Sequence, residues 1–178
     1  MSITVIRAAD RPEVPWKNGG GTTREIAVFP PGAGMDDFLW RLSMAKVEEA
    51  GPFSIFPGTD RTLGLIEGQL ALNGSDVNVT LDEVSAPLPF RADLPVDSVP
   101  IDGPALDLNA MVRRGHFTVS MTRLAAGDIV DCTQDCFVIA LSGQRHHDIW
   151  LDKLDCLSGT FSAQLEGAAF FVKFTAAQ

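Results

Sequence analysis

Apolar and polar residues alternate along most of this chain with a period of two, which is the pattern of β-strands that bury one face. The clearest example is the segment 38–47, where Trp40, Leu42 and Met44 form one row of side chains. The opposite row is small and apolar except for Arg41 at its middle. This segment therefore predicts a strand that carries a guanidinium on or near the interior of a barrel.

The same alternation, interrupted by Gly, Pro, Asn and Asp, predicts the other strands. They cover residues 2–6, 24–29, 62–66, 69–72, 77–81, 116–124, 135–141, 157–161 and 168–174. In the strand 24–29 we expect Arg24, Ile26 and Val28 on one face and the intervening residues on the other. Few amphipathic helices of useful length appear, so the pattern predicts an all-β sandwich or barrel fold.

Five prolines between Ala86 and Pro104 indicate an extended connection, with room for edge strands. Similar strand spacing continues on both sides of it. We therefore expect two β-lobes in one 178-residue unit, an N-terminal lobe at about 1–104 and a C-terminal lobe at 105–178, with strands open to exchange between them.

The charge balance argues against polyanionic partners. The chain has 14 Lys and Arg against 23 Asp and Glu, a net charge of −9, which disfavours nucleic acid and anionic membrane surfaces. Residues 1–61 hold 7 basic and 8 acidic side chains, whereas the rest holds 7 and 15. The N-terminal third is therefore the favoured place for a small anion.

The N-terminal residues show no leader pattern, and no apolar run is long enough to span a bilayer. We expect a cytoplasmic protein. Three cysteines, Cys132, Cys136 and Cys156, are then most simply interpreted as free thiols, because a zinc site would need further ligands at suitable spacing.

The stretch 15–30 is dense in groups that bind ligands. Lys17, Asn18 and Thr22 surround three consecutive glycines, and Glu25 follows on the predicted strand. Such a glycine run suggests positive φ angles or close approach of the backbone to another group. A ligand-binding loop and a plain glycine turn into an edge strand are both consistent with it.

Two arginines are candidate anion-binding groups. Arg41 at mid-strand requires either an internal partner, for which Glu25 is the candidate, or a ligand carboxylate. Arg61 follows Asp60 on a tight turn, where it is either a solvated surface charge or an anion-binding group at a barrel mouth.

A third segment places Asp107, Asn109, Met111 and Arg113 on one strand face. This polar row either lines a pocket or faces water. The adjacent His146 and His147 would point to opposite faces of a strand and are interpreted as surface residues.

Two enzyme classes are disfavoured. The glycine run lacks the Gly-Lys-Ser/Thr ending of a phosphate-binding loop, and a strand follows it in place of a helix. No Gly-x-Ser-x-Gly nucleophile motif occurs, and nothing marks a triad partner for His116.

The segment 15–26, Pro-Trp-Lys-Asn-Gly-Gly-Gly-Thr-Thr-Arg-Glu-Ile, resembles the HutD/Ves family of the cupin superfamily. The segments 38–43, 51–61 and 107–113 are similar to that family in the same order and spacing, across about residues 5–125. The resemblance implies a bicupin, with two cupin-type β-barrels or sandwiches, and a bacterial cytoplasmic protein linked to histidine utilisation. It also allows a homodimer.

The chain departs from metal-binding cupins, whose pattern includes His-x-His, because it has three His and no such pair. We therefore expect no metal and no cofactor. The basic side chains favour a protein that binds a small carboxylate. The resemblance implies a regulatory role and makes intermediates of histidine breakdown, such as urocanate or N-formylglutamate, the expected ligands. The ligand-binding residues would be Lys17, Asn18, Thr22, Glu25, Arg41, Arg61, Asn109 and Arg113. A metal-independent enzyme acting through Glu25 or Lys17, and an interaction protein with a vestigial pocket, are the alternatives.

Overall fold

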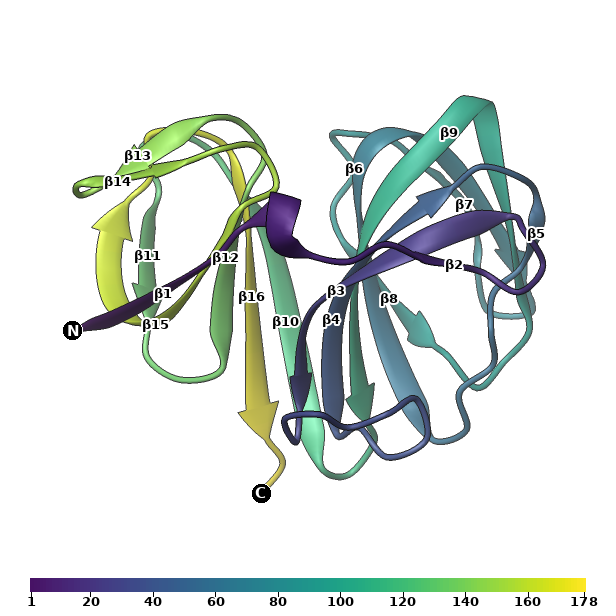
Figure 1. Cartoon of the computed structure of the whole chain (residues 1–178). Coiled ribbons are helices and arrows are strands. Elements are labelled where there is room, and N and C mark those ends of the chain that lie inside the picture. Colours follow the sequence, from purple (N-terminus) through teal and green to yellow (C-terminus); the bar gives the residue numbers. More distant parts are fainter. The chain divides into compact units, whose positions relative to one another are not determined.

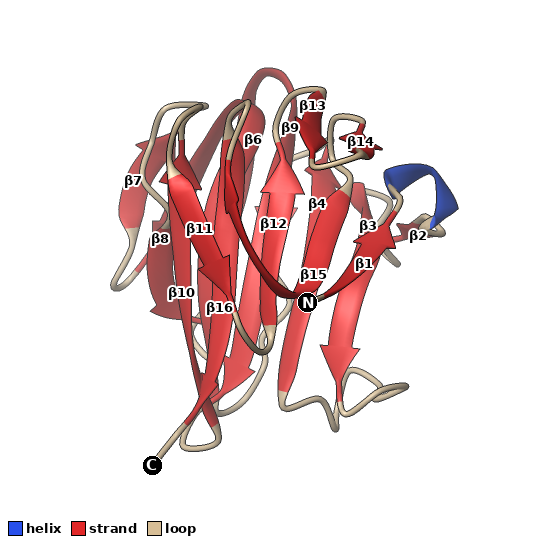
Figure 2. Cartoon of the chain, turned by 90° about the vertical axis from the view of Figure 1, so that its left-hand side faces the viewer, coloured by secondary structure: helices blue, strands red, loops and turns tan.

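The computed structural model describes all 178 residues, and the chain divides into two compact β-units. One unit comprises Pro12–Thr118 with the last two residues, and the other comprises Met1–Arg11 with Val119–Ala176. Almost every element is a strand, and a three-residue 3-10 turn, η1 (Ala8–Asp10), is the single helical segment (Figure 2). No helix in the chain is therefore long enough to cross a membrane.

The larger unit is built on one eight-stranded sheet with the order β2-β3-β4-β9-β6-β7, in which β5 also pairs with β9 and β8 with β6 (Figure 1). Its strands are β2 (Val14–Pro15), β3 (Gly21–Phe29), β4 (Trp40–Val47), β5 (Gly51–Pro52), β6 (Thr59–Gly74), β7 (Asn78–Leu81), β8 (Leu88–Arg91) and β9 (Val96–Arg113). All the pairings are antiparallel, and the long strands β6 and β9 lie side by side at its centre.

The smaller unit contains a sheet with the order β1-β15-β12-β16-β10, to which β11 adds by pairing with β15, and a separate β13-β14 hairpin (Figure 2). Its strands are β1 (Ser2–Ile6), β10 (Phe117–Leu124), β11 (Ile129–Cys132), β12 (Cys136–Ala140), β13 (Gln144–His146), β14 (Ile149–Leu151), β15 (Cys156–Gln164) and β16 (Ala169–Ala176). The N-terminal strand pairs with β15, with Ser2 opposite Thr160. A strand from the start of the chain thus belongs to the C-terminal unit, an exchange that the sequence left open.

The all-β prediction is confirmed, but the boundary expected at residue 104 is wrong. The proline-rich segment from Ala86 to Pro104 contains β8 and the first half of β9, and β9 continues without a break to Arg113. The division falls between Thr118 and Val119. Prolines were compatible with this sheet because Pro89 lies in the short strand β8 and Pro104 in a stretch of β9 that lacks regular pairing with β6.

Two further expectations on strands are corrected. The predicted strands 62–66 and 69–72 are one strand, β6, because the register shifts around Glu67 and Gly68 without ending the pairing with β9. Gly68 has φ +81° and lies against the Pro104 carbonyl, which explains why glycine occupies that irregularity. In β3 a register shift between Glu25 and Ala27 places Glu25 opposite Ser43 and Val28 opposite Arg41, so the simple alternation expected for 24–29 is broken.

Each unit has its own apolar core. In the larger unit the core includes Leu63, Leu65, Leu70, Leu72 and Val47, with Trp16, Phe53 and Phe90 packed against it. In the smaller unit it includes Val138, Ala140, Leu151, Leu157 and Phe161. Because Leu63 and Leu65 share a strand face with Arg61, the core side of the larger sheet also carries the polar residues described below.

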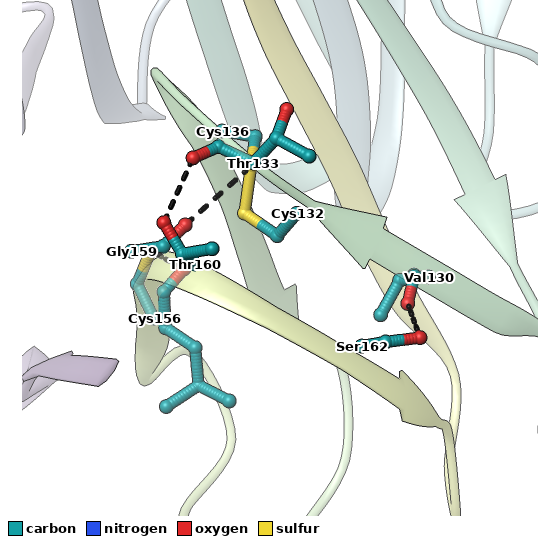
Figure 3. The surroundings of a disulfide bond; sticks show 9 residues. Val130, Cys132, Thr133, Cys136, Cys156, Gly159, Thr160 and Ser162 are labelled. Carbon is teal, nitrogen blue, oxygen red and sulfur yellow. Dashed lines mark hydrogen bonds between the residues drawn. A yellow bond between two sulfur atoms is a disulfide. The ribbon is translucent and has the colours of Figure 1, made fainter. Parts of the chain in front are cut away.

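The expectation of three free thiols is wrong for two of them. Cys132 and Cys136 form a disulfide across the connection between β11 and β12, with their Cα atoms 5.7 Å apart, while Cys156 is buried and free (Figure 3). That Cα separation is within the normal range for a disulfide. The Thr160 hydroxyl also donates to the Thr133 carbonyl at 2.9 Å, which holds the connection against β15.

Candidate functional site

A polar cluster occupies the core face of the larger sheet where β4, β9 and β6 run side by side. Opposite Met111 on β9 lie Arg41 on β4 and Arg61 on β6. The next row on the same face holds Ser43, Asn109 and Leu63, and the row after that holds Ala45, Asp107 and Leu65. Strand register thus brings together polar side chains that are far apart in sequence.

Arg61 is the most unusual member of this cluster. It is 6% exposed, and its guanidinium carbon lies 4.8 Å from the ring centroid of Phe53, 5.8 Å from Phe56 and 5.7 Å from Phe90. Aromatic faces stabilise a cation, but they offer no acceptor in the plane of the guanidinium. Its Nε is buried and has no hydrogen-bond partner.

The surroundings lower the pKa of Arg61 to about 10. Burial is the main cause, the nearby Asp107 charge opposes it, and the positive charge of Arg41 adds to it. Arg61 remains charged at neutral pH. It is therefore a buried cation without a contacting counter-ion, which is costly unless an anion binds there.

Asp107 is fully buried, and burial raises its pKa to about 7. Three interactions lower the pKa of Asp107 and so oppose that rise: the charge of Arg61, the hydrogen bond from the Asn109 side chain and a hydrogen bond from the Ala45 backbone. The Asn109 Nδ2 donates to Asp107 Oδ1, whereas Asp107 Oδ2 and Asn109 Oδ1 have no hydrogen-bond partner. The cluster therefore contains one unpartnered donor atom and two unpartnered acceptor atoms, all buried.

Arg41 has the internal partner that the sequence suggested. Its Nε donates to Glu25 Oε2 at 2.9 Å, and its Nη1 donates to the Ser43 hydroxyl at 3.3 Å. The Glu25 side chain is 44% exposed and that of Arg41 is 11% exposed. Exposure thus decreases from Glu25 at the rim, through Arg41, to Arg61 and Asp107 in the interior.

The structure brings together Glu25, Arg41, Arg61 and Asn109 among the predicted site residues. Asp107 was noted in the sequence as part of the same row as Asn109 but was not selected. Its signal was the two-residue spacing from Asn109, which places both side chains on one strand face. The phenylalanines around Arg61 were missed because no local pattern indicated that they surround it.

The structure places Lys17, Asn18 and Thr22 elsewhere. Lys17 and Asn18 are exposed in the turn between β2 and β3, where Asn18 Oδ1 accepts from the Gly20 N–H at 2.9 Å. Thr22 lies opposite Lys46 and on the other face from Glu25. The glycine-rich stretch thus forms a tight turn into a strand, which was the plainer of its two interpretations.

Arg113 is engaged by backbone carbonyls. Its guanidinium donates to the carbonyls of Phe38, Pro57 and Asp36 at 3.4, 3.3 and 2.8 Å. It also lies over the Phe38 ring at 5.3 Å. These contacts tie the connections that precede β4 and β6 to the end of β9, so Arg113 supports these loops.

Histidine placement differs from the expectation of two surface residues. His147 is exposed, but His146 is 4% exposed, with its ring against Phe161 and its Nε2 unpartnered. Burial and the neighbouring His147 lower the pKa of His146. No group of three or more His, Cys, Asp or Glu side chains gathers closely enough to hold a metal ion, and the absence of a metal cofactor stays a prediction.

Comparison with known proteins identifies the family. The HutD family model matches residues 8–170. This chain belongs to the HutD family. HutD from Pseudomonas fluorescens SBW25, solved in a formate condition, superposes with a TM-score of 0.86 at 28% identity, covering 99% of this chain and 100% of that one.

The chain is also similar in sequence to curated proteins, including one from Citrobacter koseri and one from Pseudomonas putida. Protein Ves of Citrobacter koseri is 40% identical over 101 residues, which are 56% of this chain and 52% of that protein. An uncharacterized 21.2 kDa protein in the hutC 3′ region of Pseudomonas putida is 48% identical over 66 residues, 37% of this chain and 34% of that protein. The matches thus span about half or less of these two relatives. They link HutD-family proteins to the histidine-utilisation region.

Proposed function

We propose that this protein binds a small carboxylate on the core face of its larger sheet, with Arg61 as the principal anion-binding group. The observation that carries the proposal is the buried Arg61 guanidinium, whose Nε has no partner. A carboxylate matches the planar fork of a guanidinium and accepts two parallel hydrogen bonds from it. Such a ligand would supply the counter-ion that the folded chain does not place in contact with Arg61.

Arg41 has a supporting role in this proposal. Glu25 and Ser43 already accept hydrogen bonds from Arg41. In this proposal Arg41 therefore contributes positive potential and a contact at the exposed end of the cluster, and Arg61 contributes more to the affinity for the ligand. The three phenylalanine rings hold the Arg61 guanidinium in place before a ligand arrives, which lowers the entropy lost on binding. The ligand would therefore meet a pre-positioned cation.

The HutD family link makes intermediates of histidine breakdown, such as urocanate and N-formylglutamate, the natural ligands to test. In this proposal the protein is cytoplasmic and its two β-units are cupin-type barrels. Ligand occupancy reports the flux through the pathway, so the role is regulatory. A homodimer is compatible with that role.

A metal-independent enzyme acting on such an intermediate is the second candidate, and Asp107 is the observation that favours it. Its pKa of about 7 suits a general base at neutral pH. Glu25 is engaged by Arg41 and Lys17 is exposed in a turn, so Asp107 replaces them in this role. Turnover of the same ligands by the pure protein, lost in Asp107→Asn, would distinguish an enzyme from a sensor.

The binding proposal is tested by calorimetric titration of urocanate, N-formylglutamate and simple carboxylates into the wild type and Arg61→Met. Methionine keeps an apolar chain among the phenylalanines and removes the charge, so the variant should fold. We expect its affinity to fall about 100-fold, because two charge-assisted hydrogen bonds are lost. Arg114→Met removes the same charge from an exposed position paired with Asp60 and should bind like the wild type. Equal affinities in Arg61→Met and the wild type would refute the assignment.

A further inference from the structure

The buried acceptors of the polar cluster carry information about the ligand beyond its charge. A carboxylate ligand satisfies Arg61 and leaves Asp107 Oδ2 and Asn109 Oδ1 without a donor. Both residues lie on β9, two positions apart, on the face that carries Arg61 one strand away. The cluster therefore has an acceptor side next to its cationic side.

The orientation of these acceptors follows from their mutual contact. The amide nitrogen of Asn109 donates to Asp107 Oδ1, so the amide oxygen of Asn109 points away from that bond. Above its pKa of about 7 the Asp107 carboxylate can only accept hydrogen bonds, which prevents the reverse arrangement of the amide. Each residue thus presents one oxygen that needs a donor.

The neighbouring side chains supply no such donor. The positions that flank Asn109 and Asp107 on β6 are Leu63 and Leu65, and Ala45 flanks Asp107 on β4. Ser43, opposite Asn109, accepts from Arg41 through its oxygen, and its hydroxyl donates to neither Asn109 Oδ1 nor Asp107 Oδ2. Buried polar atoms in native proteins are normally hydrogen-bonded, so two unpaired oxygens on the same face point to a missing partner.

We infer that the ligand carries an N–H donor in addition to its carboxylate, and that Asn109 and Asp107 accept from this N–H side while Arg61 holds the carboxylate. The inference rests on the binding function proposed above and narrows its ligand class. A polarised or cationic N–H suits this side best, because it forms a charge-assisted bond with the Asp107 carboxylate. A carboxylate ligand without an N–H donor would leave Asp107 Oδ2 and Asn109 Oδ1 buried and unpaired. Leaving buried polar groups of the site unpaired lowers affinity strongly, so such ligands should bind more weakly.

The experiment compares matched ligands that differ in the donor. Urocanate has an imidazole N–H, and 3-(2-furyl)acrylate has the same carboxylate, vinyl group and ring size without it. N-acetylglycine and acetoxyacetate form a second pair that places the donor at a different distance from the carboxylate. Dissociation constants are measured by calorimetry at pH 8, where Asp107 is ionised. We expect the N–H member of at least one pair to bind at least tenfold more tightly than its partner.

The double variant Asp107→Leu/Asn109→Leu removes both acceptors and the bond between them while keeping the same number and branching of side-chain heavy atoms. It should reduce the N–H preference to within twofold and retain binding of the donor-free ligand through Arg61. Thr62→Val is the matched control, because Thr62 is buried on β6 with its side chain on the opposite face, and it should keep the full preference.

The outcomes separate the two proposals. Equal binding within both pairs by the wild type would overturn the N–H inference and leave the carboxylate site intact. A preference that persists in the double variant would overturn the assignment to Asp107 and Asn109. Failure of every carboxylate to bind would refute the proposed function, and the inference with it. If the double variant does not fold, the wild-type comparison still decides whether a donor is required.

Discussion

Replacing Asp107 by asparagine should stabilise the protein, and more so as the pH rises. The wild-type carboxyl has a pKa of about 7 in the folded protein because it is buried, against about 3.9 for an unfolded chain. Between these values the folded state keeps a proton that the unfolded state has lost. The free energy of unfolding therefore falls as the pH rises through this window, until Asp107 ionises in the folded state as well.

The magnitude follows from the size of the pKa shift. About three pKa units at ~1.36 kcal/mol each give a cost of roughly 4 kcal/mol at pH 8 and roughly 1 to 2 kcal/mol at pH 5. Asparagine does not ionise and keeps an oxygen that accepts from the Asn109 amide. The stability of Asp107→Asn relative to the wild type should therefore increase by roughly 2 to 3 kcal/mol between pH 5 and pH 8.

Urea unfolding of both proteins at pH 5, 6, 7 and 8 measures this difference. His146, whose pKa is lowered in the folded state by burial and by His147, makes its own pH-dependent contribution, which is common to both proteins and cancels. Asp97→Asn, an exposed position on the same strand, is the control and should give a profile parallel to the wild type. A difference between Asp107→Asn and the wild type that stays constant from pH 5 to pH 8 would refute the reasoning about the buried carboxyl.

Two further predictions concern parts of the fold outside the cluster. Replacing both Cys132 and Cys136 by serine should lower the free energy of unfolding by about 2 kcal/mol, because the disulfide closes a short loop in the unfolded chain. Urea unfolding of the oxidised wild type and of the variant measures this difference, and identical unfolding midpoints would contradict the prediction. Gly21→Ala should destabilise the protein by about 2 kcal/mol or more, since the added Cβ meets the Lys46 carbonyl and the Trp16 ring. Thermal unfolding tests this, with Gly51→Ala as the control, because a Cβ at Gly51 makes only an ordinary van der Waals contact. An unchanged melting temperature for Gly21→Ala would show that the turn adapts.

Local alternation in the sequence determined much of the strand content. The segment 38–47 predicted the two faces of β4 correctly, with Trp40, Leu42 and Met44 on one and Arg41 on the other. Asp107 and Asn109 were likewise placed on one face of a strand before their neighbours were known. Such predictions succeed because the period of two is a property of each strand by itself.

Bulges and other interruptions of strand pairing could not be predicted from the alternation of apolar and polar residues. The bulge in β3 moves Glu25 opposite Ser43, and the irregularity at Gly68 keeps β6 continuous where a turn was expected. A glycine or a charged residue has the same local signature in a bulge and in a turn. The pairing with β4 or β9 decides between them, and those partners come from distant parts of the chain.

The identity of the central site residue was decided by tertiary structure. In the sequence Arg61 follows Asp60 in a charged pair on a turn, which is typical of a solvated surface. In the fold Asp60 pairs with Arg114, while Arg61 lies among Phe53, Phe56 and Phe90 on the core face. Sequence by itself determined which residues alternate along each strand. Only the pairing and packing of the sheet, which set the face that loses water and the charges that meet there, made Arg61 a buried cation with an unpartnered Nε.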